Sequence, residues 1–115
     1  MPMPDRLDVL LQFYEEDPED AFTQFALAQE YLKRGDTAQA LAFFTRLAEQ
    51  HPEYVGTYYH LGKLQERLGQ HEAAVKTYRQ GIQVAQRQRD FKNLSELQDA
   101  LLHAQGVGFE EDDDA

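Results

Sequence analysis

The sequence predicts an all-α fold of about six helices, arranged as antiparallel helix pairs that repeat along the chain. Three observations lead to this prediction. Matching residues recur at a shift of 34 positions, apolar residues recur at helical spacings of three and four, and no segment alternates as a β-strand would. The 115 residues, 42% of them hydrophobic, suffice for about one small domain with a modest core.

An N-terminal helix is predicted over residues 5–16. Asp5 stands before it as the N-cap, and its apolar stripe consists of Leu7, Leu10, Leu11 and Tyr14. We expect this helix to be the second helix of a repeat that lacks its first helix.

Two helix pairs follow, over residues 18–51 and 52–88. The shift of 34 residues aligns identical residues, among them Pro18-Glu19 with Pro52-Glu53, Leu27 with Leu61, Gly35 with Gly69, and Ala40 with Ala74. Glycine suits the left-handed residue that ends a helix, and proline cannot continue one, so these residues mark helix ends. The alanines let two helix backbones approach closely, and Phe44 and Tyr78 fill the space beside them.

A final helix over residues 90–105 is expected to cover the last pair, with a stripe of Leu94, Leu97, Leu101 and Ala104. Asp90 is its predicted N-cap. Because Gln86 stands where a proline would end the preceding helix, that helix either turns near 86–90 or runs on through Arg87 and Arg89. Together these segments form a predicted single domain over residues 1–105.

Charge is concentrated at the two ends of the chain. The formal net charge is −10, made up of −6 over residues 1–20, +1 over 21–105 and −5 over 106–115. Acidic ends repel DNA, RNA and anionic lipid, so we predict neither a nucleic-acid nor a membrane partner. The glycines and acids of residues 106–115 predict a disordered acidic tail. This tail is either a solubilising terminus or, through Phe109 and its five acids, a ligand for a basic groove.

Over residues 18–88 the sequence resembles the tetratricopeptide repeat family, in particular its small bacterial proteins. The family pattern is a large residue, Leu-Gly, Tyr, Ala, Phe and Pro at fixed spacing. It is matched by Leu27-Ala28, Tyr31, Ala40, Phe44 and Pro52 in the first copy and by Tyr58, Leu61-Gly62, Ala74 and Tyr78 in the second. Gln24, Gln65 and Gln86 depart from it. The resemblance implies an α–α superhelix in which the first helix of each pair lines a concave groove.

Seven residues are predicted to line that groove and bind a peptide: Phe25, Gln29, Lys33, Tyr59, His60, Lys63 and Arg67. In each helix a spacing of four forms a ladder from an aromatic residue to a cation. Cations pair with carboxylates, which predicts an acidic peptide or a C-terminal carboxylate as the ligand. One class of the family clamps the C-terminal carboxylate of chaperones with Lys and Asn, but Phe25 and Gln29 stand at such positions here. That function therefore does not carry over.

Three competing interpretations of these residues stay open. The cations Lys33, Lys63 and Arg67 are also typical of solvated helix faces. The aromatic rings could instead pack against a neighbouring helix, and His60 could have no functional role.

The predicted function is a non-catalytic, cytoplasmic adaptor that binds another protein, and the alternative is a self-association module that uses the ends of the helix stack. A monomer or a weak homo-oligomer is expected. No catalytic, cofactor-binding or metal site is predicted, because the chain has no cysteine and no two histidines four residues apart. The single serine, Ser95, lies in the covering helix without a histidine–acid pattern beside it.

Overall fold

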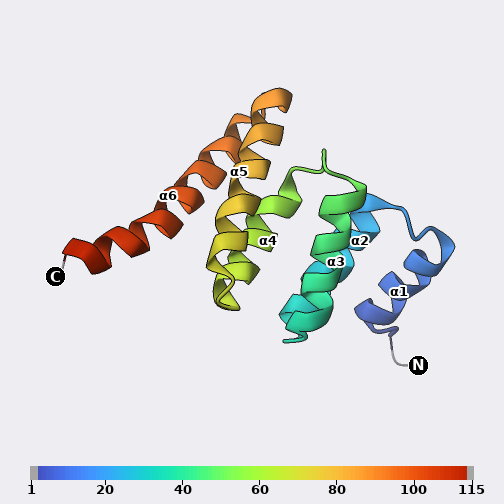
Figure 1. The fold of residues 1–115 in the computed structure, drawn as a ribbon. Coiled ribbons are helices and arrows are strands. Elements are labelled where there is room, and N and C mark those ends of the chain that lie inside the picture. The colour runs from blue at the N-terminus through green and yellow to red at the C-terminus, as the bar shows by residue number, and fades with distance from the viewer. Residues whose placement is uncertain (1–2, 114–115) are drawn as a thin grey trace. The chain divides into compact units, whose positions relative to one another are not determined.

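The computed structural model describes residues 3–113, with side chains for residues 3–106, and over this range it contains α-helices and no strand. The chain divides into two compact units, Met1–Tyr54 and Val55–Ala115. Unit 1 contains α1 (Arg6–Glu16), α2 (Ala21–Lys33) and α3 (Thr37–Gln50), and unit 2 contains α4 (Gly56–Arg67), α5 (His71–Gln88) and α6 (Phe91–Asp113) (Figure 1). The predicted all-α class is confirmed, whereas a single domain over residues 1–105 stays a prediction.

Aspartate side chains begin four of the helices. The carboxylates of Asp5, Asp20, Asp36 and Asp90 accept hydrogen bonds from the backbone N–H groups of Leu7, Thr23, Gln39 and Asn93, respectively. These N–H groups lie in the first turn, where a helix offers them no carbonyl partner. The N-caps predicted at Asp5 and Asp90 are therefore present.

Left-handed residues end three of the helices. Gly35 and Gly69, with φ of 84° and 78°, follow α2 and α4, as their alignment predicts. Arg89, with φ of 57°, takes the same role after α5. The predicted turn near residues 86–90 is thus observed, and the alternative of a continuous helix through Arg89 is wrong.

The last helix is longer than the sequence predicts. The backbone of α6 continues to Asp113, whereas the pattern of apolar residues predicts an end near residue 105. Glycine lowers helix propensity but leaves the backbone N–H group in place, so Gly106 does not end the helix as proline would. The side chains of residues 107–115 lie outside the described residues, and the proposals of a disordered or groove-docking tail stay predictions.

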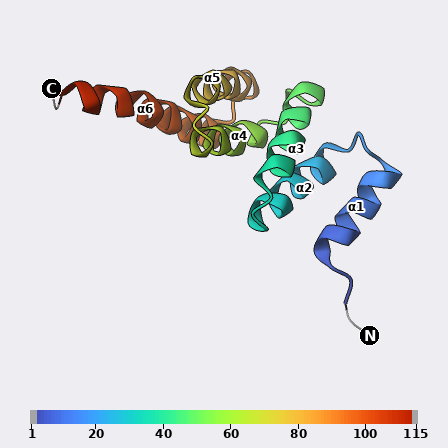
Figure 2. The same cartoon turned by 60° about the horizontal axis from the view of Figure 1, so that its bottom comes forward.

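In unit 1, α2 and α3 pack as an antiparallel pair (Figures 1 and 2) around Leu27, Ala28, Ala40, Phe44 and Leu47, which are fully buried. Gln24, where the family pattern has an aromatic residue, is also fully buried. Its amide Nε2 donates to the Pro18 carbonyl at 2.7 Å and to Gln50 Oε1 at 2.8 Å. These two bonds satisfy the buried Nε2 group and join the loop before α2 to the end of α3, whereas Oε1 of Gln24 has no hydrogen-bond partner among the described residues.

Ion pairs attach α1 to α2. Arg34, just after α2, donates to the carboxylate of Asp5 and, at 2.8 Å, to that of Glu30. Arg6 lies 3.2 Å from the other oxygen of Glu30, whose side chain is only 7% exposed. The hydrogen bonds from Arg34 hold the pKa values of Asp5 and Glu30 below their ordinary values. The carboxylates of Asp5 and Glu30 and the guanidinium of Arg34 are therefore all charged in the folded state at neutral pH.

In unit 2, α4 and α5 form the second pair, and α6 packs on both. Two glycines let the helices approach closely. A Cβ atom at Gly62 would lie 2.2 Å from Cε1 of Tyr78, and one at Gly81 would lie 2.5 Å from Cβ of Tyr58. Tyr78 is fully buried and its hydroxyl donates to Glu66, so its ring has no free space into which it could move.

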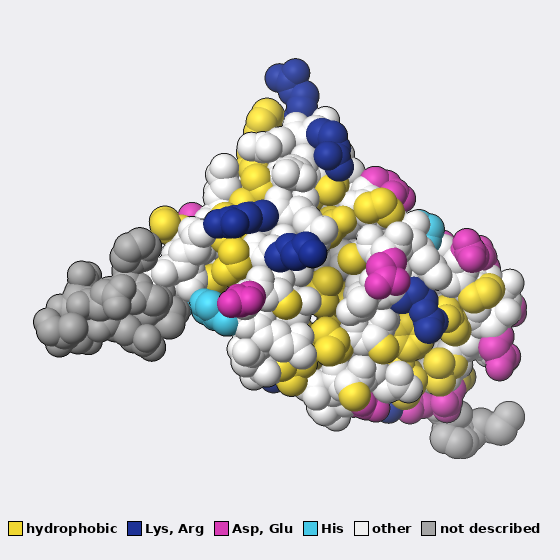
Figure 3. All heavy atoms as spheres, in the orientation of Figure 1, with side chains coloured by type: hydrophobic (Ala, Val, Ile, Leu, Met, Phe, Trp, Pro, Cys, Tyr) yellow, Lys and Arg dark blue, Asp and Glu magenta, His cyan; other side chains and the backbone are white. Residues whose placement is uncertain are grey.

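Surface charge differs between the units. Residues 3–54 contain four Lys or Arg and eleven Asp or Glu, whereas residues 55–106 contain seven and five. Figure 3 shows Lys and Arg side chains over the end of unit 2 where α5 meets α6, and Asp and Glu side chains over α1. Residues 3–54 are therefore net negative, and residues 55–106 are net positive.

Gly62→Ala is expected to lower the free energy of unfolding. Overpacking a buried site typically costs about 1–3 kcal/mol, which exceeds the roughly 1 kcal/mol by which alanine is preferred to glycine in a helix. Gly106→Ala is the matched control, because nothing lies within 4 Å of its new Cβ. Urea unfolding followed by circular dichroism checks both variants, and equal stability of the two would contradict the close approach of α4 and α5.

Arg34→Gln is expected to destabilise the protein at neutral pH and to do so less in acid. Asp5 and Glu30 have lowered pKa values in the folded state, so their contribution is complete above the ordinary carboxyl pKa of about 4 and disappears as the pH falls through the folded values. Urea unfolding of wild type and variant, in steps from about pH 7 to pH 2, measures the difference. A difference that is constant over this range would show that the ion pairs are not its cause.

Candidate functional site

In unit 1, the predicted groove residues Phe25, Gln29 and Lys33 lie on α2. The ring of Phe25 is half-buried, with centroids 6.1 Å from Phe44 and 5.5 Å from Tyr54. Gln29 and Lys33 are exposed. Phe25 thus packs among aromatic rings of its own unit, as the alternative interpretation expects, while a ligand at Gln29 and Lys33 stays a prediction.

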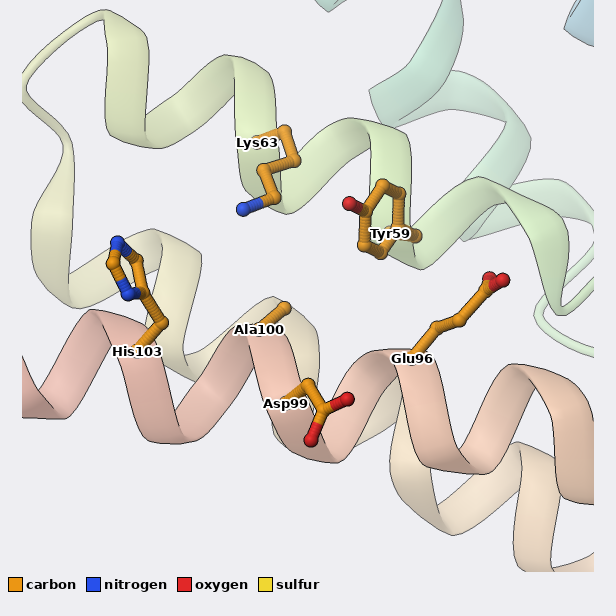
Figure 4. A pocket seen from close by; sticks show the side chains of 6 residues that line it. All are labelled: Tyr59, Lys63, Glu96, Asp99, Ala100 and His103. Atoms are coloured by element: carbon orange, nitrogen blue, oxygen red, sulfur yellow. The ribbon is translucent and has the colours of Figure 1, made fainter.

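In unit 2, two predicted groove residues lie beside a cleft. Tyr59 and Lys63, one turn apart on α4, line a cavity of about 580 Å³ between α4 and α6. Its other lining residues come from α6: Glu96, Asp99, Ala100 and His103. Figure 4 shows the Tyr59 and Lys63 side chains on α4 facing those of Glu96 and His103 on α6. The volume is within the range of sites that bind small molecules or peptide side chains.

From the sequence, this helix is predicted to cover the last pair, with only Asn93 at the far end of the groove, so the α6 side of the cleft was not predicted. The signal was nevertheless present. Glu96, Asp99, Ala100 and His103 recur at spacings of three and four, which places them on one side of a helix. The spacing alone does not show that this side of α6 faces Tyr59 and Lys63, because that contact depends on the tertiary structure.

The α4 wall combines an aromatic ring with a cation. The Nζ atom of Lys63 lies 5.5 Å from the centroid of Tyr59 and 4.0 Å from Oε2 of Glu66. An ion pair of that length at the surface is weak, and the Lys63 side chain is 40% exposed. Lys63 can therefore donate hydrogen bonds to a ligand carboxylate without first losing a strong partner.

The α6 wall is acidic. Glu96 and Asp99 are exposed, and neither forms an ion pair with another residue in the described part of the chain. Their carboxylates can accept hydrogen bonds from a cationic side chain. The cleft thus has a cationic side on α4 and an acidic side on α6, so a ligand with charges of both signs fits it best.

His60 and Arg67, which were also predicted groove residues, do not line the cleft. His60 is half-buried and meets Tyr59 edge-on, with ring centroids 5.8 Å apart. Burial lowers the pKa of His60, and the nearby charge of Glu96 partly opposes this shift. Arg67 is exposed at the last residue of α4. A role for either residue in binding stays a prediction.

Asn93, at the start of α6, has a structural role. Its side-chain amide donates to Asp90 at 2.8 Å, and its backbone N–H is the group that Asp90 caps. Within the described residues, no group of three or more His, Asp or Glu side chains is arranged to hold a metal ion. Over the same range, none of the helices combines the length and apolar character that crossing a membrane requires.

Comparison with known families matches residues 31–97 to the tetratricopeptide repeat. Among solved structures, a tetratricopeptide repeat domain protein from Salinibacter ruber, determined by NMR, is 58% identical, with a TM-score of 0.75 over 79% of this chain and 92% of that one. A crystal structure of a Salinibacter ruber tetratricopeptide repeat domain protein is 57% identical, with a TM-score of 0.74 over 76% and 98%.

A more distant structure shows the fold alone. The TPR2B domain of yeast Sti1, solved in complex with pHsp70, is 17% identical, with a TM-score of 0.80 over 88% of this chain and 81% of that one. The comparison with curated proteins gave no match. The family match extends over more than half of the chain and agrees with the antiparallel pairs α2–α3 and α4–α5. The chain belongs to the tetratricopeptide repeat family.

Proposed function

We propose that this protein is an adaptor that binds an extended segment of a partner protein in the cleft between α4 and α6. The tetratricopeptide fold and its solved neighbours indicate a protein–protein interaction module, in a family that is generally non-catalytic. Binding in this cleft is supported by the cavity of about 580 Å³ in which Tyr59 and Lys63 face three polar side chains of α6.

The ligand in this proposal carries a carboxylate next to a basic residue. Lys63 would pair with the carboxylate, as the sequence predicts, and the ring of Tyr59 beside it would make an apolar contact with the ligand. Glu96 and Asp99 would repel a wholly acidic segment, whereas a Lys or Arg one or two residues from the carboxylate would pair with them. The sequence predicts an acidic peptide as the ligand, and the proposed ligand adds a basic residue to the carboxylate.

Lys63→Glu is expected to weaken binding of such segments about tenfold, which corresponds to about 1.4 kcal/mol. Short random peptides displayed on phage are selected against the wild-type protein, and the affinities of synthetic copies are measured by titration calorimetry. The selected peptides should combine Asp, Glu or a free C-terminus with Lys or Arg. When these peptides bind, the NMR chemical shifts of the protein that change should belong mainly to residues of α4 and α6.

Lys76→Glu is the matched control. It makes the same change of charge at an exposed residue of α5 that does not line the cleft. Equal weakening by both variants would indicate only long-range electrostatics, and unchanged affinity in Lys63→Glu would refute the proposed site. Asp99→Lys gives a second check, because selection against this variant should no longer favour a basic residue.

A further inference from the structure

The helix α6 corresponds to the first helix of a pair. Asp90 caps α6 as Asp20 caps α2, each through the third residue that follows it, and a buried leucine, Leu97 or Leu27, stands seven residues after each cap. In the described part of the chain, however, α6 is the last helix and no second helix follows it. The side of α6 that a second helix would cover is therefore open.

Contacts in unit 1 identify that side. On α2, Gln24 bonds Gln50 of α3 and Tyr31 stacks on Phe43 of α3, with ring centroids 5.8 Å apart. The same register places Leu94 and Leu101 of α6 at the positions of Gln24 and Tyr31.

Both of these leucines are only half-buried. The two large apolar residues beside them, Phe91 and Leu102, are 65% and 70% exposed. This open surface, the α6 face, consists of Phe91, Leu94, Leu101 and Leu102. Exposed apolar residues grouped on one side of a helix are typical of an interaction site.

The helix α1 has the complementary position, because it corresponds to the second helix of a pair. The 34-residue shift aligns Leu10 with Phe44 and Phe13 with Leu47. Leu10 is buried, as Phe44 is, but Phe13 is 51% exposed whereas Leu47 is fully buried. Phe13 is thus open to solvent where Leu47 is covered. The open surface of α1, the α1 face, consists of Val9, Phe13 and Glu16.

We propose that α1 of a second copy of this chain docks on the α6 face, so that two copies together complete one helix pair. Register and charge both support a second copy as the partner. Each face is apolar at its centre, and each has the charge that complements the other at one end.

The register of this contact follows from the pair α2–α3. There the end of α3 lies against the loop before α2, since Gln24 bonds both Gln50 and Pro18, and Nε2 of His51 lies 2.6 Å from the carbonyl oxygen of Glu19. The loop that corresponds to Pro18 and Glu19 is the turn between α5 and α6, at residues 88–89.

In the proposed contact, Glu16 and Asp17 of the second copy take the positions of Gln50 and His51. They then lie beside Arg89, which takes the position of Glu19. Antiparallel pairing of α1 with α6 thus brings acids to the end of α6 at which cations are exposed.

The charges at this end have no ion-pair partners among the described residues. The cations around the α5–α6 turn are Arg87, Arg89 and Lys92, and the acids at the end of α1 are Glu15, Glu16 and Asp17; all six are exposed. Parallel pairing of two α6 faces, or of two α1 faces, would bring like charges together. A second copy docked head to tail brings each set of charges to the set of opposite sign, and this favours it.

Head-to-tail docking joins two different surfaces, so it continues beyond two copies and produces open rows unless the rotation between copies closes a ring. Each row retains a free α1 face at one end and a free α6 face at the other. Because charged groups contribute, association should weaken as salt is added. The mass of the assembly should rise continuously with protein concentration.

Sedimentation equilibrium over a concentration series tests the proposal with two charge-reversed variants. One is Arg89→Glu, and the other combines Glu16→Lys with Asp17→Lys. Wild type is expected to show a weight-average mass that grows with concentration. Each variant alone should associate at least about tenfold more weakly, and Lys76→Glu, which makes the same charge change as Arg89→Glu on α5 outside the contact, should behave as wild type.

An equimolar mixture of the two variants decides whether the contact is the proposed one. In the mixture, the carboxylate introduced at position 89 of one variant meets the lysines introduced at positions 16 and 17 of the other. The unaltered Arg89 of the second variant likewise meets the unaltered acids of the first. Association should therefore return, which loss of folding in either variant could not produce. Circular dichroism confirms that each variant is helical.

Three outcomes would overturn the proposal. They are a wild-type protein that stays monomeric at every concentration, variants that associate as wild type does, and a mixture that associates no better than its components. A monomeric wild type would leave the two faces to a different partner. Phe13→Ser supplies an independent check, because it removes the apolar contact without changing charge and should weaken association in the same way.

Discussion

The close approach of antiparallel helices is the constraint on which the rest of this structure depends. At Gly62 the backbone of α4 lies against the ring of Tyr78, and no Cβ atom fits between them. Packing of this density fixes the position of α4 relative to α5, because neither helix can shift without creating an overlap or a cavity. It sets where Tyr59 and Lys63 lie relative to α6, which packs on the same pair. A site formed by two helices needs such a rigid support if its opposing side chains are to keep their separation.

Polar contacts supplement this packing where apolar contact is interrupted. Gln24 is buried where an aromatic residue is usual, and its two hydrogen bonds replace the apolar contact that such a residue would make. Arg34 joins the carboxylates of Asp5 and Glu30 and so attaches α1, which has little buried apolar surface of its own. These bonds are directional, so they add to the specificity with which packing sets the register of each helix.

The two proposed surfaces of α6 lie on different sides of the helix. Glu96, Asp99 and His103 face the cleft, whereas Phe91, Leu94 and Leu101 belong to the α6 face. At roughly 100° per residue the two groups centre on different sides of the helix axis, and their nearest members, Asp99 and Leu102, are about 60° apart. A ligand in the cleft and a second copy on the α6 face would not compete for the same atoms. Rows of head-to-tail copies would therefore present the cleft repeatedly, and binding of a multivalent partner would gain from that repetition.

The sequence by itself determined the helix pairs, their ends and their caps, because these depend on local spacing and on residues such as Gly35, Gly69, Asp5 and Asp90. It also indicated Lys63 and Tyr59 as candidate groove residues, since their four-residue spacing can be recognised in the sequence itself. Only the tertiary structure placed α6 opposite them and buried Gln24, because contacts between helix faces depend on the three-dimensional approach of segments that are distant in sequence. The length of α6 was likewise not predictable from apolar spacing, because a helix continues through its backbone hydrogen bonds and does not require an apolar stripe to do so.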